Sequence, residues 1–410
     1  MSIARPSEAL RRTLRRALGV ILPSDVETRL LRCLLYRGDD GRRAWLDWRN
    51  AVGNPMTAFT GERLGQKSLL PLLHAAAERN AIELEPPVAR WLRATYLREQ
   101  LRGNAYRRIL GETVAAVGAT GRVPIVIKGC ALADTVYPDP GTRHSHGIEL
   151  LVREDDVEYC IARLPDLGYT VVTRNKSRRP DQVMLSWRHA SGLPLELRTR
   201  LFDIPRHAGD IESAWARARP LPGPPALQLA PEDALLQVCG SATMSGSRTS
   251  LRWVCDAGFL LQYHRDSFDW RLFVRRVETA RLGLPLSGVL RYLVEALRLP
   301  IPHEILGQLD AMAEATDDVG HEVAAMGALV ASHARMRRLI LAGPDWRTRW
   351  ILARRLLVPS PECVREMGWV DGEQWLPAYY LRRPLEYAGL RLARLAARQQ
   401  AAFARPPGSR

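Results

Sequence analysis

The sequence is poor in lysine and has no long apolar run. Only Lys67, Lys128 and Lys176 among its 59 basic residues are lysines, and the rest are arginines. No run of about 18 apolar residues occurs, which excludes a transmembrane helix of ordinary length. The Arg-rich, amphipathic stretch at residues 1–20 lacks the apolar core and the small-residue cleavage site of a signal peptide. We therefore expect a soluble, cytoplasmic protein.

Cysteine is also scarce, and its spacing carries no metal or disulfide pattern. The six cysteines are scattered, and no two of them form a CxxC pair. This spacing argues against a zinc site and against a disulfide framework. We expect all six to be small buried apolar side chains: Cys33, Cys130, Cys160, Cys239, Cys255 and Cys363.

The net charge of +15 is spread along the chain and is not gathered in one arm. A positive surface attracts nucleic acids and nucleotides alike. No RNA-recognition, zinc-finger or KH signature is present, so we expect no sequence-specific nucleic-acid partner. Arginine with abundant alanine, leucine, glycine and proline is typical of GC-rich coding, as in many bacteria. A triphosphate or an acidic partner explains the charge equally well.

Hydrophobic periodicity divides the 410 residues into three regions. Residues 1–121 and 218–410 carry apolar residues at helical spacing, and a Pro-rich connection at 218–233 begins the second of these regions. Residues 122–217 mix short β-branched runs with short helices, and two of the runs read as a hairpin turning at residues 190–192. The fold class predicted is α+β, with a small mixed β-sheet core flanked by N-terminal and C-terminal helical regions.

The most informative stretch runs from Val123 to Val152. VPIVI reads as a buried strand, Lys128-Gly129 ends it, a short helix follows, and PDPG is strong turn chemistry. IELLV then reads as a second buried strand that carries Glu149. A phosphate fits a corner between a strand, a glycine and a helix, and a carboxylate would face it from the next strand.

This stretch resembles the uncharacterised nucleotidyltransferase-like proteins of the polymerase-β superfamily. Their pattern runs roughly "pvvllKG, small helix, lYpdpglR, three residues, D-h-D-h-L-V". Lys128-Gly129, the turn at 137–141, Arg143 and residues 149–152 match it in order and spacing. The family's first Asp falls on Gly147 and its second on Glu149. The resemblance continues more weakly through 230–233 and 251–256 to 358–362.

The resemblance implies transfer of a nucleoside monophosphate from an NTP to a small-molecule, peptide or protein acceptor. In this chemistry two carboxylates at i and i+2 of one strand hold Mg²⁺ or Mn²⁺, and a third acts from a neighbouring strand. Glu149 and Glu196 are the candidate catalytic residues and metal ligands. The candidate nucleotide-binding and phosphate-binding residues are Lys128, Gly129, Arg143, Arg252 and Asp256.

Gly147 opens a second hypothesis, a pseudoenzyme that binds a nucleotide or acts as a scaffold. If only the missing acid weakens the site, Gly147→Asp should strengthen divalent-metal binding. Other readings stay open for single residues. Glu196 is also explained as a strand residue paired with Arg198 or Arg200, Lys128 as the partner of a nearby acid, and Asp256 as the partner of Arg252.

Overall fold

A computed structural model of the chain describes residues 22–60, 67–118, 121–173, 184–202, 207–244 and 251–315. It also describes seven single positions, which are Trp346, Arg349, Trp350, Pro361, Val364, Tyr379 and Tyr380. The chain divides into two compact units, one of residues 1–5 and 14–317 and the other of 6–13 and 318–410. The elements that follow all belong to the first unit.

Helices make up the N-terminal part of this unit, and their ends have local causes. Ser24 and Glu27 form a capping box that starts the first described helix. Pro86 and Pro87 begin the longest of the described helices and Gly118 follows its end, where the sequence signals for a helix start and stop stand. The helices are α2 (Asp25–Leu35), α3 (Gly38–Val52), α4 (Pro55–Thr60), α6 (Leu70–Arg79) and α7 (Pro86–Val117).

A seven-stranded mixed sheet forms the centre of the unit, with the order β3-β4-β5-β2-β1-β7-β6. The predicted α+β class with helical flanks is therefore confirmed. The strands are β1 (Ile125–Val126), β2 (Ile148–Leu151), β3 (Tyr169–Thr173), β4 (Met184–His189), β5 (Pro194–Arg198), β6 (Arg219–Pro220) and β7 (Leu227–Gln228).

The predicted hairpin is confirmed, because β4 and β5 pair antiparallel on either side of residues 190–192. The Pro-rich connection, however, is more than a linker. It contributes β6 and β7, and β7 pairs parallel with β1. Two-residue strands carry no readable alternation, and Pro220 is compatible with a strand at the edge of a sheet, so the sequence pattern did not reveal them.

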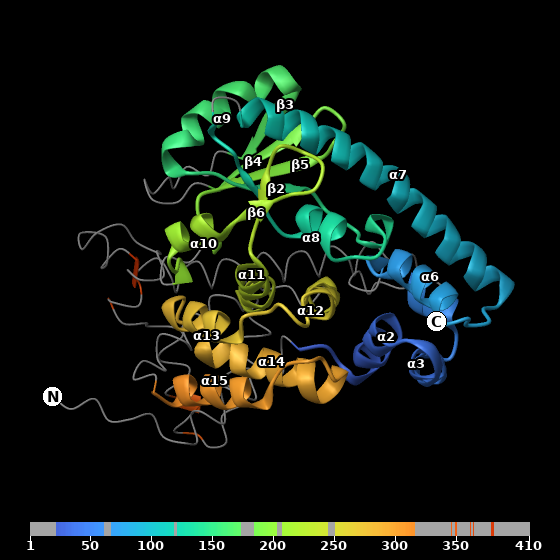
Figure 1. Cartoon of the computed structure of the whole chain (residues 1–410). Coiled ribbons are helices and arrows are strands. Elements are labelled where there is room, and N and C mark those ends of the chain that lie inside the picture. The colour runs from blue at the N-terminus through green and yellow to red at the C-terminus, as the bar shows by residue number, and fades with distance from the viewer. Residues whose placement is uncertain are drawn as a thin grey trace. The chain divides into compact units, whose positions relative to one another are not determined.

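Alternation along the strands separates an apolar face from a polar one. Ile148, Leu150, Leu195 and Leu197 are fully buried and pack in one cluster with apolar residues of α7. Helices α7 and α9 (Val157–Arg163) lie on this side of the sheet, whereas the C-terminal helices lie on the other (Figure 1). Cys130 and Ala131 of α8 (Gly129–Thr135) pack in the same cluster as the apolar residues of α7. The intervening residues of β2 and β5 therefore point away from α7, toward the C-terminal helices.

The C-terminal helices of this unit share the larger apolar core with the N-terminal ones. Buried ion pairs also join three of these helices. Asp233 has a fully buried side chain that accepts from Arg217 at 2.6 Å and from Arg276 at 2.7 Å. The helices are α10 (Ile211–Arg217), α11 (Pro231–Met244), α12 (Arg252–Tyr263), α13 (Trp270–Thr279), α14 (Gly283–Leu297) and α15 (His303–Ala315).

Five cysteines are free and buried, as predicted, and Cys363 lies outside the described residues. The sequence also predicts a basic loop at 174–180 and helices near 319–342 and 376–404. Apart from Tyr379 and Tyr380, these residues lie outside the described ones too. Across the ranges that the structure describes, no helix combines the length and the apolar character needed to cross a membrane.

Replacing Asp233 with alanine should lower the free energy of unfolding by about 3–5 kcal/mol, because it leaves two arginines without their shared carboxylate. Chemical denaturation measures this loss. Asp25→Ala is the control, since Asp25 pairs with Arg29 at 2.9 Å in an exposed position, where the expected loss is at most about 1 kcal/mol. Equal losses in the two variants would contradict a structural role for the Asp233 cluster.

Candidate functional site

The two candidate acids lie side by side on neighbouring parallel strands. Glu149 of β2 is the register partner of Glu196 of β5. Both side chains are partly exposed on the face opposite the apolar cluster, with 20% of Glu149 and 33% of Glu196 accessible. The sheet therefore brings together two carboxylates that are 47 positions apart in the sequence.

An arginine that the candidate set did not include occupies the space between these acids. Arg198 donates from Nε to Glu149 Oε2 at 3.1 Å and from Nη2 to Glu196 Oε2 at 2.7 Å, and only 10% of its side chain is exposed. Lys128 pairs with the same Glu149 oxygen. Among the described residues, two carboxylates and two cations thus meet in one cluster, and Glu196 pairs with Arg198, as its alternative reading supposed.

Gly147, at the position of the missing acid, touches the neighbouring strand. A Cβ atom placed on Gly147 would lie 2.7 Å from the Pro194 carbonyl oxygen and 3.2 Å from Pro194 Cβ. Real Cβ atoms essentially never approach a backbone oxygen this closely, so any side chain here forces β2 and β5 apart. The thiol of Cys130 donates to the Gly147 carbonyl at 3.4 Å, and burial raises its pKa to about 12, so it remains protonated. The expectation that Gly147→Asp simply restores a ligand is therefore at odds with the geometry.

These contacts test whether the site fits the expected metal pair. Two-metal chemistry uses three carboxylates, but the described residues offer two at this site, and both already bind cations. At Gly147, where the family's first Asp would stand, there is no room for a Cβ atom. Among the side chains in the described ranges, no group of three or more His, Cys, Asp or Glu is placed to hold a metal. The residues that the structure describes here do not fit a two-metal centre.

The Lys-Gly corner is both strained and tightly packed. Lys128 has φ 56° and ψ −133°, a conformation that costs about 1–3 kcal/mol for a residue with a side chain. A Cβ atom on Gly129 would lie 2.9 Å from Ser145 Oγ and 3.0 Å from Arg143 Nη1. Glycine at 129 thus lets the segment before β2 pack against the start of α8. In this conformation the Lys128 side chain forms its ion pair with Glu149.

Arg143 and Asp256 bind each other and are buried. Arg143 donates from Nε and Nη2 to the two Asp256 oxygens at 2.7 and 2.8 Å, and Tyr137 donates its hydroxyl to Asp256 at 2.7 Å. Burial lowers the pKa of Arg143, but Asp256 more than reverses this and leaves it raised. Burial and Asp256 hold the pKa of Tyr137 well above its ordinary value. This pair attaches α12 to the segment before β2. The partner of Asp256 is thus Arg143, whereas the sequence had suggested Arg252.

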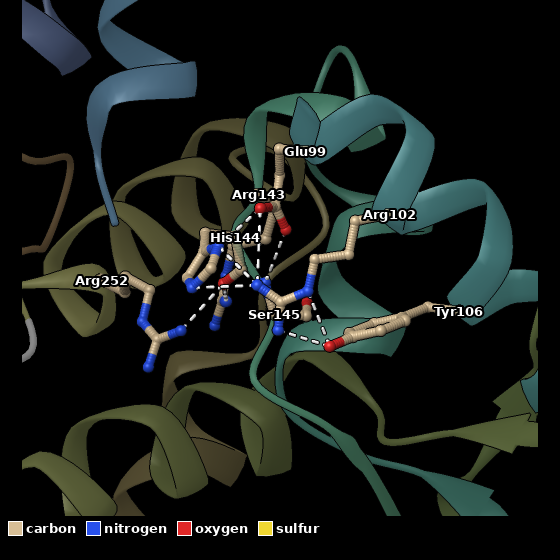
Figure 2. A network of polar contacts seen from close by, with 7 residues as sticks. All are labelled: Glu99, Arg102, Tyr106, Arg143, His144, Ser145 and Arg252. Carbon is tan, nitrogen blue, oxygen red and sulfur yellow. Dashed lines mark hydrogen bonds and ion pairs between the residues drawn. The ribbon is translucent and has the colours of Figure 1, made fainter. Parts of the chain in front are cut away.

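Arg252 lies in a polar network around residues 143–145, which Figure 2 shows. It donates from Nη1 to the His144 carbonyl at 2.9 Å, and Arg143 contacts the same oxygen. Burial and the charge of Arg143 lower the pKa of Arg252 to about 10. Arg252 is thereby a neighbour of the segment that leads into β2, and among the described residues it pairs with neither Glu149 nor Glu196.

Glu99 of α7 completes this network and was not a sequence candidate. It binds His144 Nδ1 at 2.6 Å and accepts from the Ser145 backbone N–H at 3.3 Å. Burial raises the pKa of Glu99, but the hydrogen bond and charge of His144, with Arg102, lower it overall. Arg102 in turn donates to the Tyr106 hydroxyl (Figure 2). The sequence signal for this contact was weak, because Glu99 is simply one of the two acids, with Glu112, in an arginine-rich helix.

Comparison with known proteins assigns the chain to a family. The sequence model of a family described as "Uncharacterised nucleotidyltransferase" matches residues 63–298, which is more than half of the chain. No curated protein and no solved structure matches the chain. The chain therefore belongs to this nucleotidyltransferase family. Membership implies an NTP as substrate, and such families typically depend on a divalent metal.

Gly147→Ala should lower the free energy of unfolding by about 1–3 kcal/mol, because the added methyl group overlaps the Pro194 carbonyl. The control is Gly111→Ala in α7, where a Cβ atom meets nothing within 4 Å and the helix gains about 1 kcal/mol. Urea denaturation of both variants measures the difference. If Gly147→Ala is neutral, the strands are not in contact at this position.

Asp256→Ala should lower the free energy of unfolding by about 3–5 kcal/mol, because it leaves the Arg143 guanidinium buried without its partner. Asp256→Asn should recover part of this loss, since an amide oxygen can still accept one of the two hydrogen bonds. A variant that is as stable as the wild type but binds triphosphate more weakly would instead place Asp256 in the ligand site.

Proposed function

We propose that this nucleotidyltransferase-family protein binds a nucleoside triphosphate at the Lys128–Gly129 corner and does not catalyse two-metal nucleotidyl transfer. The observation that carries the proposal is the cluster of Glu149, Glu196, Arg198 and Lys128, together with the contact between Gly147 and Pro194. The cluster already neutralises the two acids that a metal would need. The protein then acts through nucleotide binding, as a regulatory or scaffolding partner.

Lys128 supports phosphate binding through its exposure and its donor count. An ammonium group has three N–H donors, and the ion pair with Glu149 uses one direction. The side chain is 29% exposed, so its remaining donors can reach a phosphate oxygen from solvent. Arg198 is far less accessible, and within the described part of the chain it donates to both acids. Lys128 is therefore the cation in the cluster that can meet a ligand.

The overall charge of the chain supports the same ligand. With a net charge of +15, the protein attracts a triphosphate from solution before any specific contact forms. The acids in the cluster repel phosphate unless they stay paired, and Arg198 keeps both paired. Binding without a divalent metal is thus compatible with the charges of the described residues.

A second candidate function is nucleotidyl transfer with fewer acids than the superfamily uses, with a small molecule, a peptide or a protein as acceptor. The register of Glu149 against Glu196 favours it, because two carboxylates on adjacent strands are the part of the site that is retained. A transfer assay with an α-³²P-labelled NTP separates the two candidates. Labelled product that is lost in both Glu149→Gln and Glu196→Gln would support the second candidate and contradict the first.

Lys128→Gln should weaken triphosphate binding about tenfold to a hundredfold, because it removes a charge-assisted contact. Calorimetry with ATP, GTP and inorganic tripolyphosphate in the presence of EDTA measures the affinity. Lys67→Gln is the matched control, since Lys67 is an exposed lysine outside the cluster, and its affinity should equal that of the wild type. Unchanged affinity in Lys128→Gln, with lowered stability, would make Lys128 purely structural.

A further inference from the structure

The solvent-facing side of α7 carries a stripe of apolar residues. Trp91, Leu97 and Leu101 are 40%, 45% and 72% exposed, and the exposed Ala94 lies between the first two. Their spacing of three, three and four residues places them in one line along the helix. Exposed apolar side chains that are scattered singly are ordinary, whereas a contiguous row of them is typical of an interaction surface.

The opposite side of α7 is fixed in the protein. Val88 and Leu92 pack in the larger apolar core, and Leu110 and Val114 pack in the cluster beside the sheet. The N-terminal half of the helix runs past the sheet toward α6 (Figure 1). Rotation of α7 to hide the stripe would expose these buried residues, so the stripe stays on the outer side.

Arginines border the stripe. On a helical projection, Arg93 lies on one side of the two leucines and Arg98 on the other, while Arg90 and Arg108 lie toward the two ends. Every exposed charged side chain between residues 90 and 108 is an arginine. The outer side of α7 thus combines an apolar ridge with a positively charged border.

Charge and shape select the body that covers this face. The positive border repels the segment at 376–404 of the same chain, which has five arginines and one acid. A single helix is convex, so a partner protein would have to supply a groove, whereas lipids close around a ridge. Tryptophan and leucine enter the boundary between headgroups and acyl chains, and arginines reach anionic headgroups from its rim. A bilayer surface with anionic lipids therefore matches both features.

We propose that the outer side of α7 docks on the surface of a bilayer that contains anionic lipids, with the apolar stripe in the interface and the bordering arginines at the lipid phosphates. The helix then lies along the surface and does not cross it. The inference is independent of the proposed nucleotide site, because no residue of the stripe or its border belongs to the cluster around Lys128.

Co-sedimentation of the full chain with vesicles measures the docking. The vesicles contain phosphatidylcholine alone or an equal mixture of phosphatidylcholine and phosphatidylglycerol. We expect the chain to bind the mixture more tightly, and added salt to weaken this binding. Leu101→Gln should lower the affinity for the mixture about tenfold, because it removes apolar surface from the interface. The double variant Arg93→Gln/Arg98→Gln should lower it about tenfold or more, because two charges are lost.

Matched controls come from exposed positions outside α7. Leu46→Gln in α3 replaces a leucine that is 44% exposed, and Arg271→Gln/Arg275→Gln in α13 replaces two exposed arginines. Neither control should change the vesicle affinity. Because every substituted side chain is exposed, the Tm of each variant should equal that of the wild type, and a loss of binding then reports on docking and not on folding.

The fluorescence of Trp91 gives a second readout. Brominated acyl chains quench a tryptophan that enters the interface, and Trp91→Phe isolates its share among the eleven tryptophans. We expect the wild type to be quenched more strongly than Trp91→Phe. The proposal is overturned if neither vesicle binds the chain. It is equally overturned if binding and quenching are the same in the wild type and in all the α7 variants, and an acidic protein is then the partner left for this face.

Discussion

The parallel pairing of β2 with β5 is the constraint on which the rest of the site depends. This pairing places Glu149 beside Glu196 and buries Ile148, Leu150, Leu195 and Leu197 on the opposite face. It also brings the two backbones into contact at Gly147. Like charges on adjacent strands repel, and Arg198, two residues beyond Glu196 and on the same face, removes that repulsion. The same contacts that stabilise the sheet leave no position for a third acid.

Buried charge pairs attach the helices to this sheet. Asp256 of α12 holds Arg143, Glu99 of α7 holds His144 and Ser145, and Asp233 of α11 holds two arginines. Each acid is nearly inaccessible to solvent. Such pairs make removal of one partner costly, so they fix the position of the segment that leads into β2. The Lys-Gly corner packs directly against this segment through Gly129, and Lys128 adopts an unfavourable backbone conformation there.

Sequence reasoning predicted the parts of the molecule that local patterns determine. The alternation in IELLV and LPLEL indicated two strands with one acid each, and Pro86, Pro87 and Gly118 gave the ends of the longest helix. The pairing partners were harder, because Arg143 meets Asp256 across 113 positions and Glu99 meets His144 across 45. The close contact at Gly147 depends on the distance between two backbones, which no residue pattern records. The resemblance located the site, but the coordinates were needed to show that Arg198 lies between its acids.

Binding of Mn²⁺ measured by electron paramagnetic resonance tests the central claim most directly. The free-ion signal should be the same in buffer and with the protein present, and adding a non-hydrolysable NTP should reduce it only as far as the NTP alone does. This result follows if Lys128 and Arg198 retain Glu149 and Glu196. A loss of free signal that requires the protein and disappears in Glu149→Gln and Glu196→Gln would contradict the account and establish a metal site between the two acids.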